Sequence, residues 1–202
     1  MALKSAVPVV SIKGSALRTV YRYNKLSLSS VAFVTVCDVL EPAASSNGLI
    51  YTWAANVAGV PETTLVSTSK QTSSYLISEY VLVSNVVYTN EVTVFDTASS
   101  SSTTTSTDVF VQPGELVVGF TFGGDSLGVR AGEPIVVNAS LSYDLDLPNV
   151  VGLEAGLSYV WSCVQSLPTL STTCPLTVDS ASSDAEPYYS LVANVNGSTA
   201  NG

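Results

Sequence analysis

Residues 49–53 read Leu-Ile-Tyr-Thr-Trp, and residues 157–161 repeat the pattern as Leu-Ser-Tyr-Val-Trp, an offset of 108 residues. A stretch of alternating apolar residues precedes each copy, at residues 26–28 in the first and 135–141 in the second. A repeat of about 110 residues matches the size of one β-sandwich domain. The repeat therefore predicts two tandem modules, residues 1–113 and 114–202, which meet near Pro113.

The first module carries clear period-two strand signals. We expect strands at residues 7–12, 25–37, 49–57, 75–77, 86–95 and 103–111, with breaks at 41–42, 47–48 and 59–61. No convincing amphipathic helix pattern is present. Trp53 and Trp161 sit at the repeat-defining position, where a sandwich buries a tryptophan between its sheets. We therefore expect both to be core residues on strands rather than platforms for sugars.

The second module has less sequence after its tryptophan than the first. The first module continues for 58 residues beyond Trp53 to Val111, whereas only 41 residues follow Trp161. We expect no counterpart of the hairpin at 86–111, and we read the chain as a fragment of a longer protein. The predicted fold class is all-β, with two tandem immunoglobulin-like β-sandwiches, the second incomplete.

Composition narrows the function classes. Hydrophobic residues make up 46% of the 202 residues and charged residues 11%, with a net charge of −9. Seven scattered Lys and Arg argue against nucleic acid or anionic membrane as partners. The absence of histidine excludes a Ser-His-Asp triad or a Cys-His pair, and no apolar run is long enough to span a membrane. We expect no enzymatic activity, no cofactor and no direct membrane insertion.

Two of the three cysteines are expected to form a disulfide if the protein lives in an oxidising compartment. Cys163 and Cys174 lie eleven residues apart, which suits a loop-closing disulfide. Cys163 follows Trp161 by two residues and should point to the same side of its strand. Cys37 then has no predicted partner in this sequence, and it is either buried or paired with a residue outside it.

The sequence patterns for glycosylation and metal binding are less specific than the strand and repeat patterns. The sequons at Asn138 and Asn196 are candidate glycosylation sites. The nine-residue Ser/Thr run at 99–107 is expected to be a hairpin tip leading into an edge strand, with O-glycosylation as the alternative. Asp144 and Asp146 form a weak Ca²⁺ candidate, for which a turn role is favoured. No other metal site is expected. The glycines between 119 and 128 lack the order of a phosphate-binding loop and predict a turn or bulge.

The motif order resembles modules of the receptor-for-egg-jelly (REJ) region and of its relative, the polycystic-kidney-disease (PKD) repeat. The resemblance rests on Val-Asn-Ala-Ser-Leu-Ser-Tyr-Asp at 137–144 followed by Leu-Ser-Tyr-Val-Trp-Ser-Cys at 157–163. It also rests on Tyr-Thr-Asn-Glu-Val-Thr-Val-Phe-Asp at 88–96, followed by Val-Phe-Val-Gln-Pro at 109–113. The chain lacks the Trp-x-Phe-Gly-Asp-Gly ending of typical PKD repeats, and Ala55 stands where the second copy has Cys163. Both departures favour the REJ type.

The resemblance implies a non-catalytic structural or adhesion segment of a larger cell-surface or secreted protein, such as a polycystin-like ectodomain or a surface fibre. The expected partners are other modules of the same chain and protein or glycan ligands at the cell surface. A carbohydrate-binding module and an accessory module of a ciliary polycystin-like channel remain alternatives. The expected location is extracellular or at the cell surface, with a ciliary or flagellar membrane or a surface coat as options.

Overall fold

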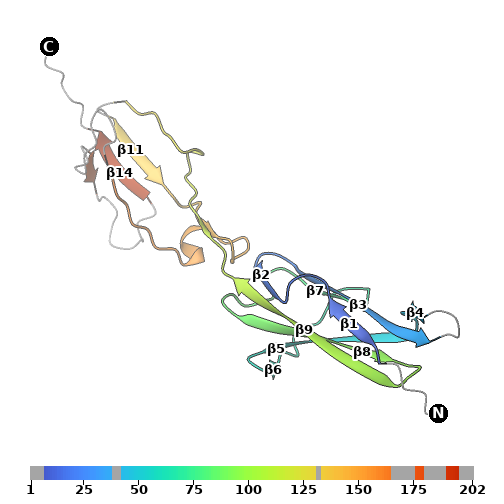
Figure 1. Cartoon of the computed structure of the whole chain (residues 1–202). Helices are drawn as coiled ribbons and strands as arrows, with labels where there is room; N and C mark the ends of the chain where they lie inside the picture. The colour runs from blue at the N-terminus through green and yellow to red at the C-terminus, as the bar shows by residue number, and fades with distance from the viewer. Residues whose placement is uncertain (1–6, 38–41, 131–132, 165–175, 180–189, 196–202) are drawn as a thin grey trace. The chain divides into compact units, whose positions relative to one another are not determined.

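The computed structural model describes residues 7–37, 42–130, 133–164, 176–179 and 190–195. The chain divides into two compact units, Met1–Gly114 (unit 1) and Glu115–Gly202 (unit 2), each of which is considered by itself (Figure 1). The described residues contain strands and one short 3-10 helix. The predicted all-β class is confirmed.

The first sheet of unit 1 is organised around β3 (Leu26–Cys37). Its first four residues pair with β7 (Ser74–Ile77), and its later residues pair with β1 (Val9–Ile12) and β4 (Pro42–Ser45), all antiparallel. β3 continues as one strand over its whole length because its Val, Phe and Thr side chains favour a pleated surface.

The second sheet has the order β2-β9-β8-β5-β6. These strands are β2 (Leu17–Tyr21), β9 (Ser101–Gln112), β8 (Val87–Asp96), β5 (Leu49–Val57) and β6 (Val60–Pro61). All pairs are antiparallel except β2 with β9, which is parallel. The N-terminal strands thus divide between the two sheets, β1 in one and β2 in the other.

The core of unit 1 lies between these two sheets. Alternate residues of β8 and β9, including Val92, Val94, Val109 and Val111, are fully buried, as period-two alternation requires. They form two clusters of apolar side chains, and Trp53 on β5 packs against both clusters. The repeated motif therefore places its tryptophan where the two halves of the core meet.

A tyrosine at the start of β8 fixes the loop that leads into the strand. The N–H of Val83 donates to the hydroxyl of Tyr88 over 3.1 Å, and Tyr88 is buried. This is the arrangement of the tyrosine corner of immunoglobulin-like domains, in which the residue two positions later is a disulfide cysteine in antibodies. Here that residue is Asn90, which is buried and donates its Nδ2 to the carbonyl of Tyr88 over 3.1 Å.

Unit 2 contains two smaller sheets. One pairs β10 (Leu116–Val117) with β12 (Tyr143–Asp144), and the other has the order β11 (Pro134–Asn138), β14 (Ser190–Val195), β13 (Leu176–Asp179). A 3-10 helix, η1, spans Gly152–Ala155. At the repeat offset β11 corresponds to the first part of β3, and each of the two has an antiparallel partner, β14 for β11 and β7 for β3, although β14 does not fall on β7 at that offset. In unit 1 two long strands follow β7, whereas only residues 196–202 of this sequence follow β14.

The second copy of the motif departs from one expectation. Residues 157–164 are not assigned to any strand, so Trp161 does not lie on a strand as predicted. The side chains still alternate between half-buried and exposed in the same phase as in β5, with Leu157, Tyr159, Trp161 and Cys163 on the inner side. The sequence pattern therefore predicts the direction of the side chains correctly, but it cannot supply the partner strand that would complete the pairing.

Candidate functional site

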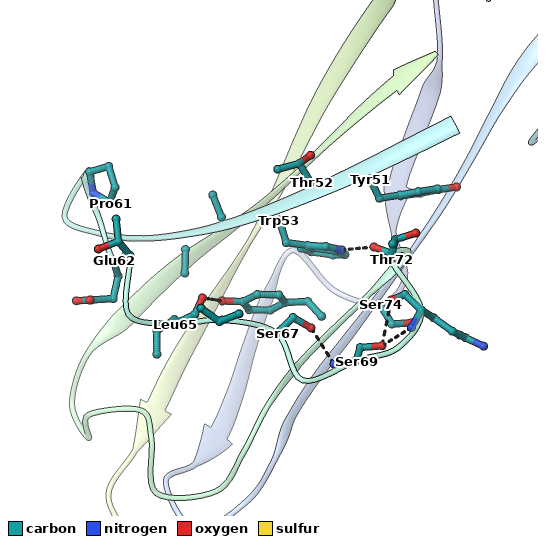
Figure 2. Close-up of a pocket in the computed structure, with 16 residues that line it drawn as sticks. Tyr51, Thr52, Trp53, Pro61, Glu62, Leu65, Ser67, Ser69, Thr72 and Ser74 are labelled. Atoms are coloured by element: carbon teal, nitrogen blue, oxygen red, sulfur yellow. Dashed lines mark hydrogen bonds between the residues drawn. The ribbon is translucent and has the colours of Figure 1, made fainter. Parts of the chain in front are cut away.

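A cleft of about 540 Å³ runs along one edge of β5 in unit 1 (Figure 2). One wall is formed by β5 residues 51–55, and the other by the segment from Pro61 to Tyr75. We call this space the β5 cleft. Its volume lies within the range of small-molecule sites.

Two aromatic side chains form the inner end of the β5 cleft. The rings of Trp53 and Tyr75 stack with centroids 5.4 Å apart and planes 21° apart. The indole N–H of Trp53 donates to the carbonyl of Thr72 over 3.0 Å, and the Tyr75 hydroxyl donates to the carbonyl of Leu65 over 3.2 Å. One face of the indole is therefore covered by Tyr75, and its only hydrogen-bond donor is used.

Burial changes the acidity of the cleft's inner tyrosine. Tyr75 is only 2% exposed, and desolvation raises its pKa to about 12. Burial disfavours the phenolate because the charge would lose its hydration. Tyr75 is therefore a neutral hydrogen-bond donor that ties β7 to the facing segment at Leu65.

The wall opposite β5 is held by its own hydrogen bonds. The hydroxyl of Ser67 accepts from the N–H groups of Ser69 and Leu76 over 3.2 and 3.0 Å. The hydroxyl of Ser69 accepts from the N–H of Gln71 and donates to its carbonyl. Because these groups satisfy one another, the wall is formed before any ligand arrives, and its serine hydroxyls are already engaged.

A second, shallower hollow lies around three tyrosines of unit 1. The rings of Tyr21 and Tyr23 stack with centroids 5.1 Å apart, and Lys25 and Glu79 form an exposed ion pair at 3.8 Å. Tyr80 has a φ of 63°, a left-handed conformation that is strained for a tyrosine. Its N–H donates to the carbonyl of Arg22 over 2.8 Å, and the Arg22 Nε donates to the carbonyl of Leu82 over 3.1 Å.

The other tryptophan of the repeat lies in a smaller pocket of unit 2, of about 210 Å³. The ring of Trp161 lies 6.4 Å from that of Phe120, and Phe120 stacks on Phe122 at 5.1 Å. Val117, Ala139 and Leu157 also line this pocket. Trp161 is half-buried and stands among apolar and aromatic side chains.

The cysteines occupy different surroundings. Cys163 is disulfide-bonded. Its predicted partner, Cys174, lies outside the described residues, so the pairing stays a prediction. Cys37 is the last residue of β3, in register with Pro42 of β4.

The predicted polar sites form turns. The Oδ1 of Asn138 accepts from the N–H of Ser140 within the sequon over 2.8 Å, and the Oδ1 of Asp144 accepts from the N–H of Asp146 over 2.8 Å. Asp146 is buried. Glycosylation at Asn138 stays a prediction, and Asn196 lies outside the described residues.

Within the part of the chain that the structure describes, no group of three or more His, Cys, Asp or Glu side chains is placed to hold a metal ion. In the same residues no helix has the length and apolar character needed to cross a membrane.

The sequence patterns pointed to one part of the β5 cleft only. The repeat singled out Trp53, and the strand alternation singled out Tyr75 as part of a short strand. The facing wall, residues 61–74, has no periodic pattern that would place it beside β5. A hint was available in its density of Ser and Thr, which favour local side-chain to main-chain hydrogen bonds.

Comparison with known families identifies the chain. A family model described as "REJ domain" matches residues 37–194, from the end of β3 in unit 1 to β14 in unit 2. The chain belongs to the REJ domain family. The resemblance to REJ modules drawn from the sequence is confirmed. The matched region of this REJ chain extends across the boundary between the two units.

A solved structure that is similar to this chain contains the three N-terminal domains of the Highly Immunogenic Outer Capsid protein (Hoc) of bacteriophage RB49. It is 15% identical with a TM-score of 0.33, and the alignment covers 69% of this chain and 40% of the Hoc chain. No curated protein matches this chain.

Proposed function

We propose that this REJ chain is a non-catalytic structural or adhesion segment of a larger cell-surface or secreted protein. The observation that carries the proposal is the REJ match over residues 37–194. A sandwich of two sheets, an acidic surface with a net charge of −9 and a disulfide at Cys163 are all suited to an extracellular environment. In this role the chain spaces or presents neighbouring modules and contacts protein or glycan partners at the cell surface. A place in a polycystin-like ectodomain of a cilium is one form of this role.

Surface labelling tests the proposed location. An antibody raised against residues 1–202 should label intact cells of the source organism, or appear in their medium, without permeabilisation. An antibody against a cytosolic protein serves as the control for membrane integrity. Labelling that appears only after permeabilisation, with none in the medium, would contradict the proposal.

A second candidate function, carbohydrate binding, is favoured by the hollow around Tyr21 and Tyr23. The two half-buried rings lie beside an amide and charged groups, a combination of side chains that can bind sugar rings and their hydroxyls. Asn24, Lys25 and Glu79 line the same hollow. A glycan array should then show binding that is lost in Tyr23→Ala and kept in Tyr143→Ala, a substitution in unit 2. An array without any bound glycan removes this candidate.

A further inference from the structure

The direction of the main-chain groups along β5 follows from one hydrogen bond. The N–H of Glu62 donates to the carbonyl of Ala55 over 2.8 Å, so Ala55 directs its main-chain groups away from β8 and toward the β6 side. In an antiparallel strand this direction alternates from residue to residue. The register of β5 with β8 is continuous from Leu49 to Val57. Tyr51 and Trp53 therefore direct their N–H and C=O groups to the same side as Ala55.

That side of β5 is only partly covered. β6 pairs with Asn56 and Val57 and ends at Pro61. Within the described residues, no hydrogen bond between these main-chain groups of Tyr51 or Trp53 and another part of the chain is recorded. Both residues line the β5 cleft. Two sets of main-chain donors and acceptors, spaced two residues apart, thus face the cleft without a strand beside them.

We infer that the β5 cleft binds an extended polypeptide segment of a partner protein, which adds to the second sheet as a strand beside β5. Main-chain hydrogen bonds would supply affinity, and alternate side chains would enter the cleft, as in other cases of strand addition. From Tyr51 to Trp53 the uncovered edge measures about 7 Å at 3.3 Å per residue, room for about two to three residues of the partner to pair. The inference goes beyond the proposed function, because a spacer module need bind nothing at this edge.

The chemistry of the cleft favours a peptide over a sugar. A sugar needs an open aromatic face and free hydroxyl or amide partners, whereas Tyr75 covers one face of Trp53 and the hydroxyls of Ser67 and Ser69 are engaged. The groups directed into the cleft are main-chain N–H and C=O, which are the complement of another strand. Glu62 is the one carboxylate in the cleft lining. The partner segment should therefore have alternate apolar residues and no acidic residue near Glu62.

The free chain offers a first measurement. Amide hydrogen exchange of the intact 202-residue chain, followed residue by residue by NMR, should show rapid exchange at Tyr51 and Trp53. The amides of Thr52 and Ala54, which face β8, should exchange slowly. Slow exchange at Tyr51 and Trp53 would show that the edge is already covered, and would overturn the inference.

Peptide selection provides the binding test. A display library of random linear 12-residue peptides is selected on the intact chain, and the most enriched peptide is synthesised with a series of single N-methyl variants. N-methylation at every second residue within the bound segment should weaken binding tenfold or more, while the residues between tolerate it. The bound peptide should also slow exchange at Tyr51 and Trp53. Failure to enrich any peptide, or N-methyl effects without alternation, would overturn the inference.

A pair of matched variants locates the site. Val66 lines the cleft and is 74% exposed, whereas Val81 is 50% exposed and lies outside the cleft lining. Val66→Asp should weaken peptide binding at least tenfold, and Val81→Asp should leave it unchanged, with both variants keeping the wild-type melting temperature. Equal effects of the two substitutions, or binding of neutral glycans that only Val66→Asp abolishes, would contradict strand addition. Either result leaves the surface location untouched, because antibody labelling tests it separately.

Discussion

At the residue scale, the repeated motif specifies which side chains turn inward. In the first copy Leu49, Tyr51 and Trp53 are half-buried and the residues between them are exposed. The second copy shows the same alternation although it is not paired as a strand. The sequence predicts this direction because alternation is a property of the extended backbone itself. It could not predict that the indole N–H of Trp53 bonds to Thr72, since that bond depends on the path of the 62–74 segment.

Tyr75 gives a prediction about alkaline pH. Its pKa is raised to about 12 in the folded chain, against 10.0 for the ordinary side chain, so the folded state favours the neutral phenol. This contribution to stability is fully present below pH 10 and is lost as the pH rises toward 12. Tyr75→Phe should therefore lose less stability than the wild type between pH 9 and pH 12. At pH 7 it should be less stable by about 1 kcal/mol, because the bond to Leu65 is missing.

Urea unfolding of unit 1 at several pH values, with the absorbance of ionised tyrosine followed in parallel, measures both effects. Tyr143→Phe, in unit 2, is the control and should leave the unfolding of unit 1 unchanged. If the free energy of unfolding depends on pH in the same way in the wild type and in Tyr75→Phe, then Tyr75 ionises without cost in the folded state, and the prediction is wrong.

At the element scale, the long strands and the short strands β1 and β7 were predictable, whereas three other short strands were not. The expected strand at 49–57 matches β5, and those at 25–37 and 86–95 match β3 and β8 to within one residue at each end, because their apolar residues alternate over many positions. β2, β4 and β6 were missed. β4 begins at Pro42 and β6 ends at Pro61, two places that the sequence marks as breaks. Proline is tolerated there because a strand end has no ladder hydrogen bond to lose.

The Ser/Thr run allows a test of edge geometry in β9. The N–H of Val111 donates to the carbonyl of Val86, whereas the N–H of Asp108 donates to Ala16 on the opposite side. Alternation then directs the N–H of Thr105 toward β8 and that of Ser106 away from it. Thr105→Pro should destabilise unit 1 by about 1–3 kcal/mol, because it leaves a carbonyl of β8 without its donor. Ser106→Pro should cost less than about 1 kcal/mol.

The urea unfolding midpoint measures the difference between the two proline variants. Thr105→Ala and Ser106→Ala provide the baselines for loss of each side chain. Equal costs for the two prolines would mean that residues 101–106 do not form the open edge seen in the structure.

At the scale of the whole molecule, the family match and the structural units do not coincide. The match begins at the end of β3 and ends within β14, so it takes part of unit 1 and most of unit 2. The predicted boundary at Pro113 lies one residue from the division between the two compact units, and the interpretation of both units as sandwiches stays a prediction. In unit 2 the sequence could not predict which strands pair. Residues 157–164 keep the motif, but they are not paired with a neighbouring strand.

Independent unfolding tests the two-domain organisation. Calorimetry of the intact chain should show two transitions. Trp53→Ala should shift only the transition of unit 1 to lower temperature. It should reduce the free energy of unfolding of that unit by about 3–5 kcal/mol, because it removes a large side chain that packs against both core clusters. Trp161→Ala should shift only the transition of unit 2. A single cooperative transition moved by both substitutions would contradict two separate domains.

The disulfide at Cys163 should affect only the unfolding transition of unit 2. We predict Cys174 as its partner, because the two residues lie eleven apart in sequence and Cys37 belongs to the other unit. Closing so short a loop contributes about 3 kcal/mol by restricting the unfolded chain. Reduction, or Cys163→Ser, should therefore lower the transition of unit 2 and leave unit 1 unchanged, and Cys37→Ser should leave the unit 2 transition as it is. Peptide mapping without reductant identifies the partner directly. A peptide that joins Cys37 to Cys163, or free thiols at both Cys163 and Cys174 in secreted protein, would show the pairing to be wrong and would remove one support for an extracellular location.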